Sequence, residues 1–229
     1  MLKQISEKLP EITNSWNPVT GCLHMCVYCW ARKYVERLSK IGVEPYASRG
    51  FKPTLVVERL RKKFSKKSFI FVSIMGDLFG EWVPETWIEK VFNCIRAQPT
   101  VYFFLLTKNP SRYLELGRLP ENTVASATIE SNRCYPDISK APVQSIRIEA
   151  MKNLKHRYKA LVLEPILDFD IDEFIEVVRE ISPVFVYIGY DNYRFNLPEP
   201  PLEKTLRFIE KISEFTEVRL GSIRKAWYE

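Results

Sequence analysis

Short apolar runs separated by amphipathic stretches are the feature that most constrains how this chain can fold. The runs are almost continuously hydrophobic and rich in β-branched and aromatic residues; they are Phe69–Met75, Val101–Thr107, Thr123–Ile129, Ala160–Ile166 and Val184–Tyr190. Strands that are buried on both faces of a sheet have this composition. The runs therefore predict internal strands of a covered sheet.

The stretches between the runs carry apolar residues at helical spacing. Asp170–Ile181 and Leu202–Phe215 show the pattern clearly. Pro84–Gln98 shows it too, with a proline suited to a first helical turn, and Val143–His156 is less regular. Strands that alternate with such helices form βαβ units, in which the strands pair in parallel through right-handed crossovers. The sequence therefore predicts an α/β fold.

Two weaker segments extend this pattern. Ser15–Thr20 predicts one further strand, and Glu217–Leu220 predicts a short last strand. About six βα units are fewer than the eight of a closed barrel, which typically needs about 250 residues. An open barrel or a doubly wound sheet remains, and in both folds reactive groups gather at the carboxyl ends of the strands.

Composition bears on the partners and the location of the protein. Lys and Arg total 34 and Asp and Glu total 28, which gives a formal net charge of +6 and a pI near 9.0. This balance is compatible with a polyanionic partner but does not require one. No apolar run approaches the roughly 20 residues needed to cross a bilayer, and the N-terminal segment lacks the apolar centre of a signal peptide. We therefore expect a soluble cytoplasmic protein that is not embedded in a membrane.

Three of the five cysteines, Cys22, Cys26 and Cys29, form a C-x3-C-x2-C cluster, whereas Cys94 and Cys134 stand alone. In a cytoplasmic chain such clustering indicates metal or redox chemistry. Zinc sites and ferredoxin-type clusters normally take four protein ligands. Three thiolates on a four-iron cluster leave one iron open to a substrate or cofactor. The alternative is a zinc site in which His24, or a distant cysteine, is the fourth ligand.

The cluster, with an aromatic Tyr28 directly before its third cysteine, resembles the signature of the radical S-adenosylmethionine (radical SAM) superfamily. Further segments are similar to a phage-associated, uncharacterised branch of that superfamily: Trp16–Cys22 (WNPVTGC), Ser73–Phe79 (SIMGDLF), Leu106–Lys108 (LTK), Glu164–Pro165 and Ile188–Gly189. These landmarks run through most of the chain. The resemblance implies a partial open (β/α)6 TIM-like barrel, which we predict as a single domain over residues 1–229.

The resemblance also implies a [4Fe-4S] cluster on Cys22, Cys26 and Cys29, whose open iron chelates S-adenosylmethionine (SAM). One electron through the cluster would cleave SAM to methionine and a 5′-deoxyadenosyl radical, which abstracts hydrogen from the substrate. We expect the electron to come from an external flavodoxin, ferredoxin or reductase, because the sequence has no second cluster motif.

Several residues near the ends of the predicted strands are candidates for binding SAM. By resemblance, Tyr28 packs near the adenine, and Met75, Gly76 and Asp77 form a turn against the methionyl amino group. The commoner form of this turn is Gly-Gly-Glu, so the sequence departs from the family here. Asp77 is expected to accept a hydrogen bond from that ammonium or, alternatively, to cap the segment that follows.

Lys108 ends the strand predicted over 101–107, where its charge can neutralise the cofactor carboxylate. Ser126, Thr128 and Glu130 alternate along the next strand, so one face presents all three. A row of hydroxyls with a terminal carboxylate suits a ribose or an amino-acid head group. The alternative is that these are ordinary small inward-facing residues.

Glu164 and Asp191 are the catalytic candidates on the substrate side. Glu164 interrupts an otherwise apolar strand, where a carboxylate is costly unless it is paired or lies near a wet cavity. Asp191 and its neighbour Asn192 follow the strand that ends at Tyr190. The sequence assigns neither carboxylate a particular step.

Two basic stretches are candidates for phosphate contacts or, alternatively, for solvated helix faces. They consist of Arg59, Arg61, Lys62, Lys63, Lys66 and Lys67, and of Arg147, Lys152, Lys155, His156, Arg157 and Lys159.

We therefore predict a radical SAM enzyme, with nucleic acid or a nucleotide as the first candidate substrate because the chain is basic. The alternative is a non-catalytic zinc or iron–sulfur module that binds nucleic acid. A simple electron carrier is disfavoured, since carriers keep their clusters fully ligated by protein.

Overall fold

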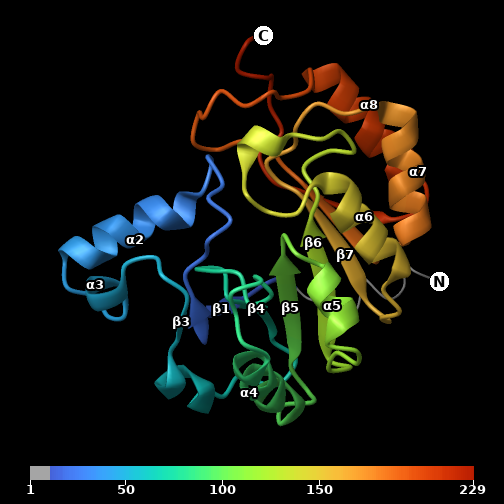
Figure 1. The fold of residues 1–229 in the computed structure, drawn as a ribbon. Helices are drawn as coiled ribbons and strands as arrows, with labels where there is room; N and C mark the ends of the chain where they lie inside the picture. The colour runs from blue at the N-terminus through green and yellow to red at the C-terminus, as the bar shows by residue number, and fades with distance from the viewer. Residues whose placement is uncertain (1–10) are drawn as a thin grey trace.

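The computed structural model describes residues 11–229, and its centre is a parallel sheet (Figure 1). Within these residues, seven strands cross the sheet in chain order: β1 (Asn14–Trp16), β4 (Phe69–Val72), β5 (Tyr102–Thr107), β6 (Thr123–Thr128), β7 (Lys159–Leu163), β8 (Phe185–Ile188) and β9 (Glu217–Leu220). The strand order does not reverse, whereas the order of a doubly wound sheet reverses at its switch point. The sheet curls into a half barrel. The predicted partial TIM-like barrel is confirmed.

Helices alternate with these strands and cover the outer face of the sheet (Figure 1). They are α4 (Glu85–Arg96), α5 (Ser111–Glu115), α6 (Gln144–Asn153), α7 (Ile171–Ile181) and α8 (Leu202–Ser213). Within residues 11–229, no helix is both long and apolar enough to cross a membrane. The prediction that no signal peptide is present concerns mainly residues 1–10, which lie outside the described part of the chain.

The segment between β1 and β4 places two helices to one side of the half barrel (Figure 1), whereas its residues Val19, Leu55 and Leu60 belong to or pack against the large core of the sheet. It contains α2 (Trp30–Lys40), α3 (Tyr46–Arg49), the 3-10 turn η1 (Val57–Arg61) and an antiparallel pair of short strands, β2 (Val19–Thr20) and β3 (Thr54–Leu55). A second 3-10 turn, η2 (Pro136–Ile138), precedes α6.

The two faces of the sheet carry two different cores, because successive side chains of a strand point to opposite faces. Leu105 and Leu161 belong to the large outer core beneath the helices. Phe104, Val162 and Phe185 belong to a smaller inner core on the concave face. The prediction of strands buried on both faces is confirmed for the central strands.

The predicted strand over Ser15–Thr20 is wrong as a single element. It is divided at Asn17 and Pro18, so that Trp16 ends β1 and Val19 begins β2 in a different sheet. Pro18 has no N–H to donate to a ladder, and the Asn17 side chain accepts a 2.9 Å hydrogen bond from the Met75 N–H. The polar pair therefore turns the chain from one sheet to the other.

Other predicted elements are present with shorter bounds. The run Phe69–Met75 leaves the sheet after Val72, because Ser73 has a φ of +57°. The helix predicted over Val143–His156 ends at Asn153, and Pro84 stands one residue before α4 rather than within its first turn.

Candidate metal and cofactor site

Two glycines anchor the cysteine loop to the end of β4. Gly21 has a φ of +84° and forms a parallel bridge with Gly76. A Cβ on Gly21 would lie 2.3 Å from the Lys52 carbonyl oxygen, and a Cβ on Gly76 would lie 2.7 Å from the Gly21 carbonyl oxygen. Neither position has room for a side chain. Cys22, the next residue, is therefore held beside the turn that follows β4.

A cavity of about 1180 Å³ runs along the concave face of the sheet to the carboxyl ends of the strands, and the three clustered cysteines line it. Cys29 is the residue that directly precedes α2, and the His24 N–H donates a 3.5 Å hydrogen bond to Cys22 Sγ. The other two cysteines lie elsewhere. Cys94 packs against the outer core, and Cys134 is exposed.

Burial raises the pKa of the Cys22 thiol, and the charges of Asp77 and of the neighbouring thiolates raise it further. Burial likewise raises the pKa of Cys26, although Lys108 opposes this effect. Three thiolates held in this place therefore repel one another. A bound metal supplies the positive charge that removes the penalty.

Within residues 11–229, no group of three or more His, Cys, Asp or Glu side chains is arranged so that it could hold a metal ion. The donor set nevertheless fits a four-iron cluster with one open iron, because three sulfurs of one loop face one cavity.

His24 and Asp77 form a buried pair that the sequence did not indicate. His24 Nε2 lies 2.9 Å from Asp77 Oδ2, which also accepts a 3.0 Å hydrogen bond from the Lys108 N–H. Asp77 Oδ1 accepts hydrogen bonds from the Thr107 hydroxyl at 2.8 Å and from the Phe79 N–H at 2.9 Å. Burial is the largest single influence and would raise the pKa of Asp77, but the hydrogen bond and charge of His24, together with the hydrogen bonds from Lys108 and Thr107, lower it below its ordinary value. Both oxygens are thus occupied, and the geometry supports the alternative in which Asp77 caps the following segment.

Glu130 is fully buried and connects three other polar side chains. Its carboxylate contacts the Tyr28 hydroxyl and the Lys108 ammonium, and it accepts a 2.6 Å hydrogen bond from Arg147 Nη1. Burial would raise the pKa of Glu130, but the charges of Lys108 and Arg147 lower it to about 2. This network fixes Tyr28, the residue before Cys29, against the end of β6.

Most predicted SAM-binding residues meet at the cavity. The lining includes Tyr28, Gly76, Asp77, Lys108 and Thr128 together with the three cysteines. Lys108 therefore reaches the cavity even though Glu130 is paired with it.

Met75, Ser126 and Glu130 lie behind this lining rather than in it. Met75 belongs to a small separate core that also contains Val35 of α2. Ser126 Oγ donates a 3.0 Å hydrogen bond to the Ala160 carbonyl oxygen. Of the predicted row of polar side chains, only Thr128 therefore reaches the cavity. Ser126 is hydrogen-bonded to the neighbouring strand, and Glu130 is ion-paired with Lys108 and Arg147.

Glu164 and Asp191 line the same cavity from the ends of β7 and β8. Burial raises the pKa of Glu164, and a 3.3 Å hydrogen bond from Asn192 Nδ2 partly opposes this. Asp191 is 5% exposed, and its carboxylate accepts hydrogen bonds from the N–H groups of Tyr193 and Phe195. Asp191 therefore shapes the loop after β8, whereas Glu164 presents a carboxylate to the cavity.

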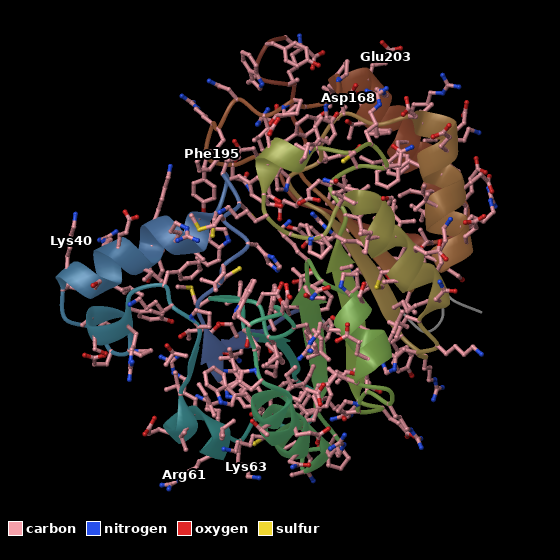
Figure 2. All side chains as sticks on the ribbon, in the orientation of Figure 1. Lys40, Arg61, Lys63, Asp168, Phe195 and Glu203 are labelled. Atoms are coloured by element: carbon pink, nitrogen blue, oxygen red, sulfur yellow. The ribbon has the colours of Figure 1, made fainter. Side chains whose placement is uncertain are left out.

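The two basic stretches differ in their surroundings. Arg147 is 1% exposed and paired with Glu130. The prediction that it contacts phosphate is therefore wrong, because the buried side chain has a structural role. Figure 2 places Arg61 and Lys63 at the far end of the molecule from Phe195, which lies beside α2. The first stretch is therefore remote from the loop that borders the cavity.

Comparison with protein families finds one whose model matches more than half of the chain. The family is described as "Protein of unknown function (DUF5131)", and the match covers residues 8–178. Comparison with curated protein sequences finds no significant match.

Comparison with solved structures finds spore photoproduct lyase. A double mutant of that enzyme, with bound AdoMet and dinucleoside spore photoproduct, has a TM-score of 0.57 at 11% identity over 88% of this chain and 61% of that chain. A single mutant has a TM-score of 0.58 at 13% identity over 89% of this chain and 75% of that chain. This chain therefore spans 61% of the length of the first of these structures. At such identities the likeness shows a shared fold.

Proposed function

This chain belongs to the family described as "Protein of unknown function (DUF5131)", and we propose that it is a radical SAM enzyme. The observation that carries the proposal is the position of Cys22, Cys26 and Cys29 on the wall of one cavity at the carboxyl end of a parallel half barrel. Reactive groups gather at this end of such folds. Spore photoproduct lyase, a radical SAM enzyme of the same fold that has been solved with AdoMet, supports SAM as the cofactor.

In this proposal Cys22, Cys26 and Cys29 hold a [4Fe-4S] cluster. When bound, the cluster supplies the open iron that chelates SAM and the electron that cleaves it to methionine and a 5′-deoxyadenosyl radical. The protein contributes by seating the cysteine loop through Gly21 and Gly76, and by enclosing the site in a cavity.

The cofactor contacts are assigned to the residues that reach the cavity. Lys108 offers positive charge to the SAM carboxylate, and Tyr28 offers its ring to the adenine. Gly76 lines the cavity and offers its backbone to the cofactor, and Thr128 offers a hydroxyl. Asp77 positions the loop through His24 instead of binding the methionyl ammonium, because its oxygens are already occupied.

An external electron donor completes the proposal. Among the described residues, the remaining thiols Cys94 and Cys134 do not line the cavity, so they provide no second cluster there. We assign the reductant to a flavodoxin, ferredoxin or reductase of the cytoplasm. The phage-associated branch is proposed from the sequence landmarks alone.

The test is anaerobic reconstitution of the full chain with iron and sulfide, followed by reduction with dithionite. We expect an electron paramagnetic resonance signal that changes when SAM is added, together with 5′-deoxyadenosine as a product. Cys22→Ala, Cys26→Ala and Cys29→Ala should each abolish both results. Cys94→Ala and Cys134→Ala are the matched controls and should retain both.

Two outcomes would contradict the proposal. Full SAM cleavage by any of the three cluster variants would exclude their cysteines as ligands. Tightly bound zinc with no iron signal would instead favour the non-catalytic module.

A further inference from the structure

The cavity has room for a second ligand beside SAM. Ligand pockets usually measure about 300–1,000 Å³, and this one measures about 1180 Å³. The cysteine loop is attached beside β4, whereas Glu164 and Tyr187 come from β7 and β8. In the sheet order, β5 and β6 separate β4 from β7. The curl of the sheet therefore leaves a second half of the cavity away from the cysteines.

Two glycines on neighbouring strands make space for the Glu164 carboxylate in that second half. A Cβ on Gly189 would lie 2.5 Å from Glu164 Oε1, and a Cβ on Gly221 would lie 2.8 Å from the same oxygen. Gly189 directly follows β8 and Gly221 directly follows β9. The close approach holds Oε1 against the sheet, so the position of the carboxylate is built into the ends of β8 and β9.

Neighbouring polar groups orient this carboxylate without using all of it. Asn192 Nδ2 donates to Glu164 Oε1 at 3.3 Å, and the Ser222 hydroxyl donates to Asn192 Oδ1 at 2.5 Å. Among residues 11–229, Glu164 Oε2 has no hydrogen-bond partner and neither does the Tyr187 hydroxyl. Glu164 and Tyr187 both line the cavity. Two polar groups are therefore available there to one bound molecule.

Aromatic rings form the apolar part of the same cavity. Phe71, Phe104 and Phe185 belong to or pack against the inner core, and all three line the cavity. The rings of Phe104 and Phe185 stack with centroids 5.8 Å apart, and Phe71 meets Phe104 edge to face at 5.2 Å. Aromatic side chains arranged in this way contact flat rings favourably.

We propose that this second half of the cavity, the Glu164 pocket, binds the base of a nucleoside unit. The stacked rings of Phe104 and Phe185 contact its apolar surface, and Glu164 Oε2 and the Tyr187 hydroxyl bind its polar edge. A carboxylate accepts hydrogen bonds from ring or exocyclic N–H groups, as Glu does from cytosine N4. Pockets that hold an extruded base combine the same two elements, aromatic contact and edge hydrogen bonds.

The border of the cavity supports a nucleotide over an uncharged planar molecule. Tyr193 lines the cavity, and two residues later Phe195 lies beneath the Lys33 ammonium of α2, 4.2 Å from its ring centroid. Figure 2 shows Phe195 beside α2. The neighbouring residue of the helix, Arg32, is a second cation at this end of α2. Such cations suit the phosphate of a free nucleotide or of a nucleic acid strand.

This inference rests on the proposed function, and its first test is a binding measurement. The reconstituted full chain, saturated with SAM, is titrated by calorimetry with each of the four deoxynucleosides. At least one should bind. Glu164→Ala and Tyr187→Phe should raise its Kd, by at least about tenfold for Glu164→Ala, since a hydrogen bond to a charged group is worth roughly 1.5–3 kcal/mol. Glu210→Gln, on the exposed surface of α8, is the matched control and should leave the Kd unchanged.

A second variant tests the position of the carboxylate without removing any polar group. Gly189→Ala places a Cβ 2.5 Å from Glu164 Oε1, too close for both atoms to stay, so the carboxylate must move and nucleoside affinity should fall at least about tenfold. Circular dichroism confirms that each variant is folded. Folded Gly189→Ala and Glu164→Ala variants that bind nucleosides as well as the wild type would overturn the proposal.

Failure of this inference and failure of the proposed function give different results. A wild-type chain that cleaves SAM but binds no deoxynucleoside, 5′-mononucleotide or oligodeoxynucleotide overturns the pocket alone. A chain that binds them but neither assembles a cluster nor cleaves SAM overturns the radical SAM assignment alone. Displacement of the nucleoside by SAM would show that the pocket is the site of the cofactor's own adenine, and it would also overturn the inference. Tighter binding of a 5′-mononucleotide than of an oligodeoxynucleotide identifies a free nucleotide as the source of the base, and the reverse identifies nucleic acid.

Discussion

Glu130 shows how single residues of this site depend on one another. Its carboxylate has no exposed surface, yet two cations and a phenol contact it. Removing one partner of a buried ion pair leaves the other charge unpaired, which costs about 3–5 kcal/mol. Because Tyr28 belongs to the network and directly precedes Cys29, the stability of the network bears on the position of the cysteine loop.

At the residue scale, we expect Glu130→Gln to lower the free energy of unfolding by roughly 3 kcal/mol at pH 7. Lys108 and Arg147 hold the pKa of Glu130 at about 2 in the folded protein, against an ordinary value of 4.5. The stability contributed by a depressed pKa is present above the unfolded value and is lost as the pH falls through the folded value. The difference between wild type and variant should therefore shrink between pH 4.5 and pH 2.

Urea unfolding of the full chain at a series of pH values measures this difference, with Glu210→Gln as the control at an exposed carboxylate. A difference that stays constant down to pH 2 would show that Glu130 is not the group whose ionisation supports the fold.

At the scale of elements, the cysteine loop is positioned by the ends of two strands. Asn17 and Pro18 interrupt the strand predicted over Ser15–Thr20, and the bridge between Gly21 and Gly76 then joins the chain to the turn that follows β4. The His24 and Asp77 pair fastens the same loop a second time. The loop is thus held by backbone contact as well as by a side-chain pair.

We expect Gly21→Ala to reduce the iron bound per chain after reconstitution by at least about twofold. The new Cβ would lie 2.3 Å from the Lys52 carbonyl oxygen, so the loop that carries Cys22 must shift. Gly117→Ala is the matched control: Gly117 also has a positive φ, +72°, but nothing lies within 4 Å of a Cβ there. A left-handed backbone costs alanine roughly 1–2 kcal/mol at either position. Equal iron content in both variants would show that the close contact does not position the ligands.

At the scale of the whole molecule, the described chain consists of a well-paired half barrel and a lighter layer beside it. β5, β6 and β7 each have a strand on both sides, whereas β1 and β9 stand at the edges of the sheet described for residues 11–229. The layer with α2 and α3 rests on a small separate core that contains Val35 and Tyr46. Local opening free energies follow the amount of buried apolar contact.

Amide hydrogen exchange of the purified full chain should therefore be slowest in β5, β6 and β7, and faster in α2 and α3. The difference should reach at least about tenfold in exchange rate, because local openings range from near zero up to the global unfolding free energy. Exchange in α2 as slow as in β6 would contradict this division of the molecule.

The sequence by itself determined the fold class and the candidate metal ligands. Continuous apolar runs between amphipathic helices specify a parallel α/β sheet because burial on both faces is a local property of each strand. Cys22, Cys26 and Cys29 lie within eight positions, so one loop presents them together whatever surrounds it. The single domain over residues 1–229 stays a prediction.

Only the tertiary structure decided which side chains reach the cavity. His24 pairs with Asp77 across 53 positions, and Tyr28 contacts Glu130 across 102. Local periodicity places Ser126, Thr128 and Glu130 on one face of the strand. However, the Ser126 hydroxyl bonds to the Ala160 carbonyl oxygen, and Glu130 is paired with Arg147. Contacts between distant residues depend on the paths of loops and on the curl of the sheet, and no local pattern of residues encodes them.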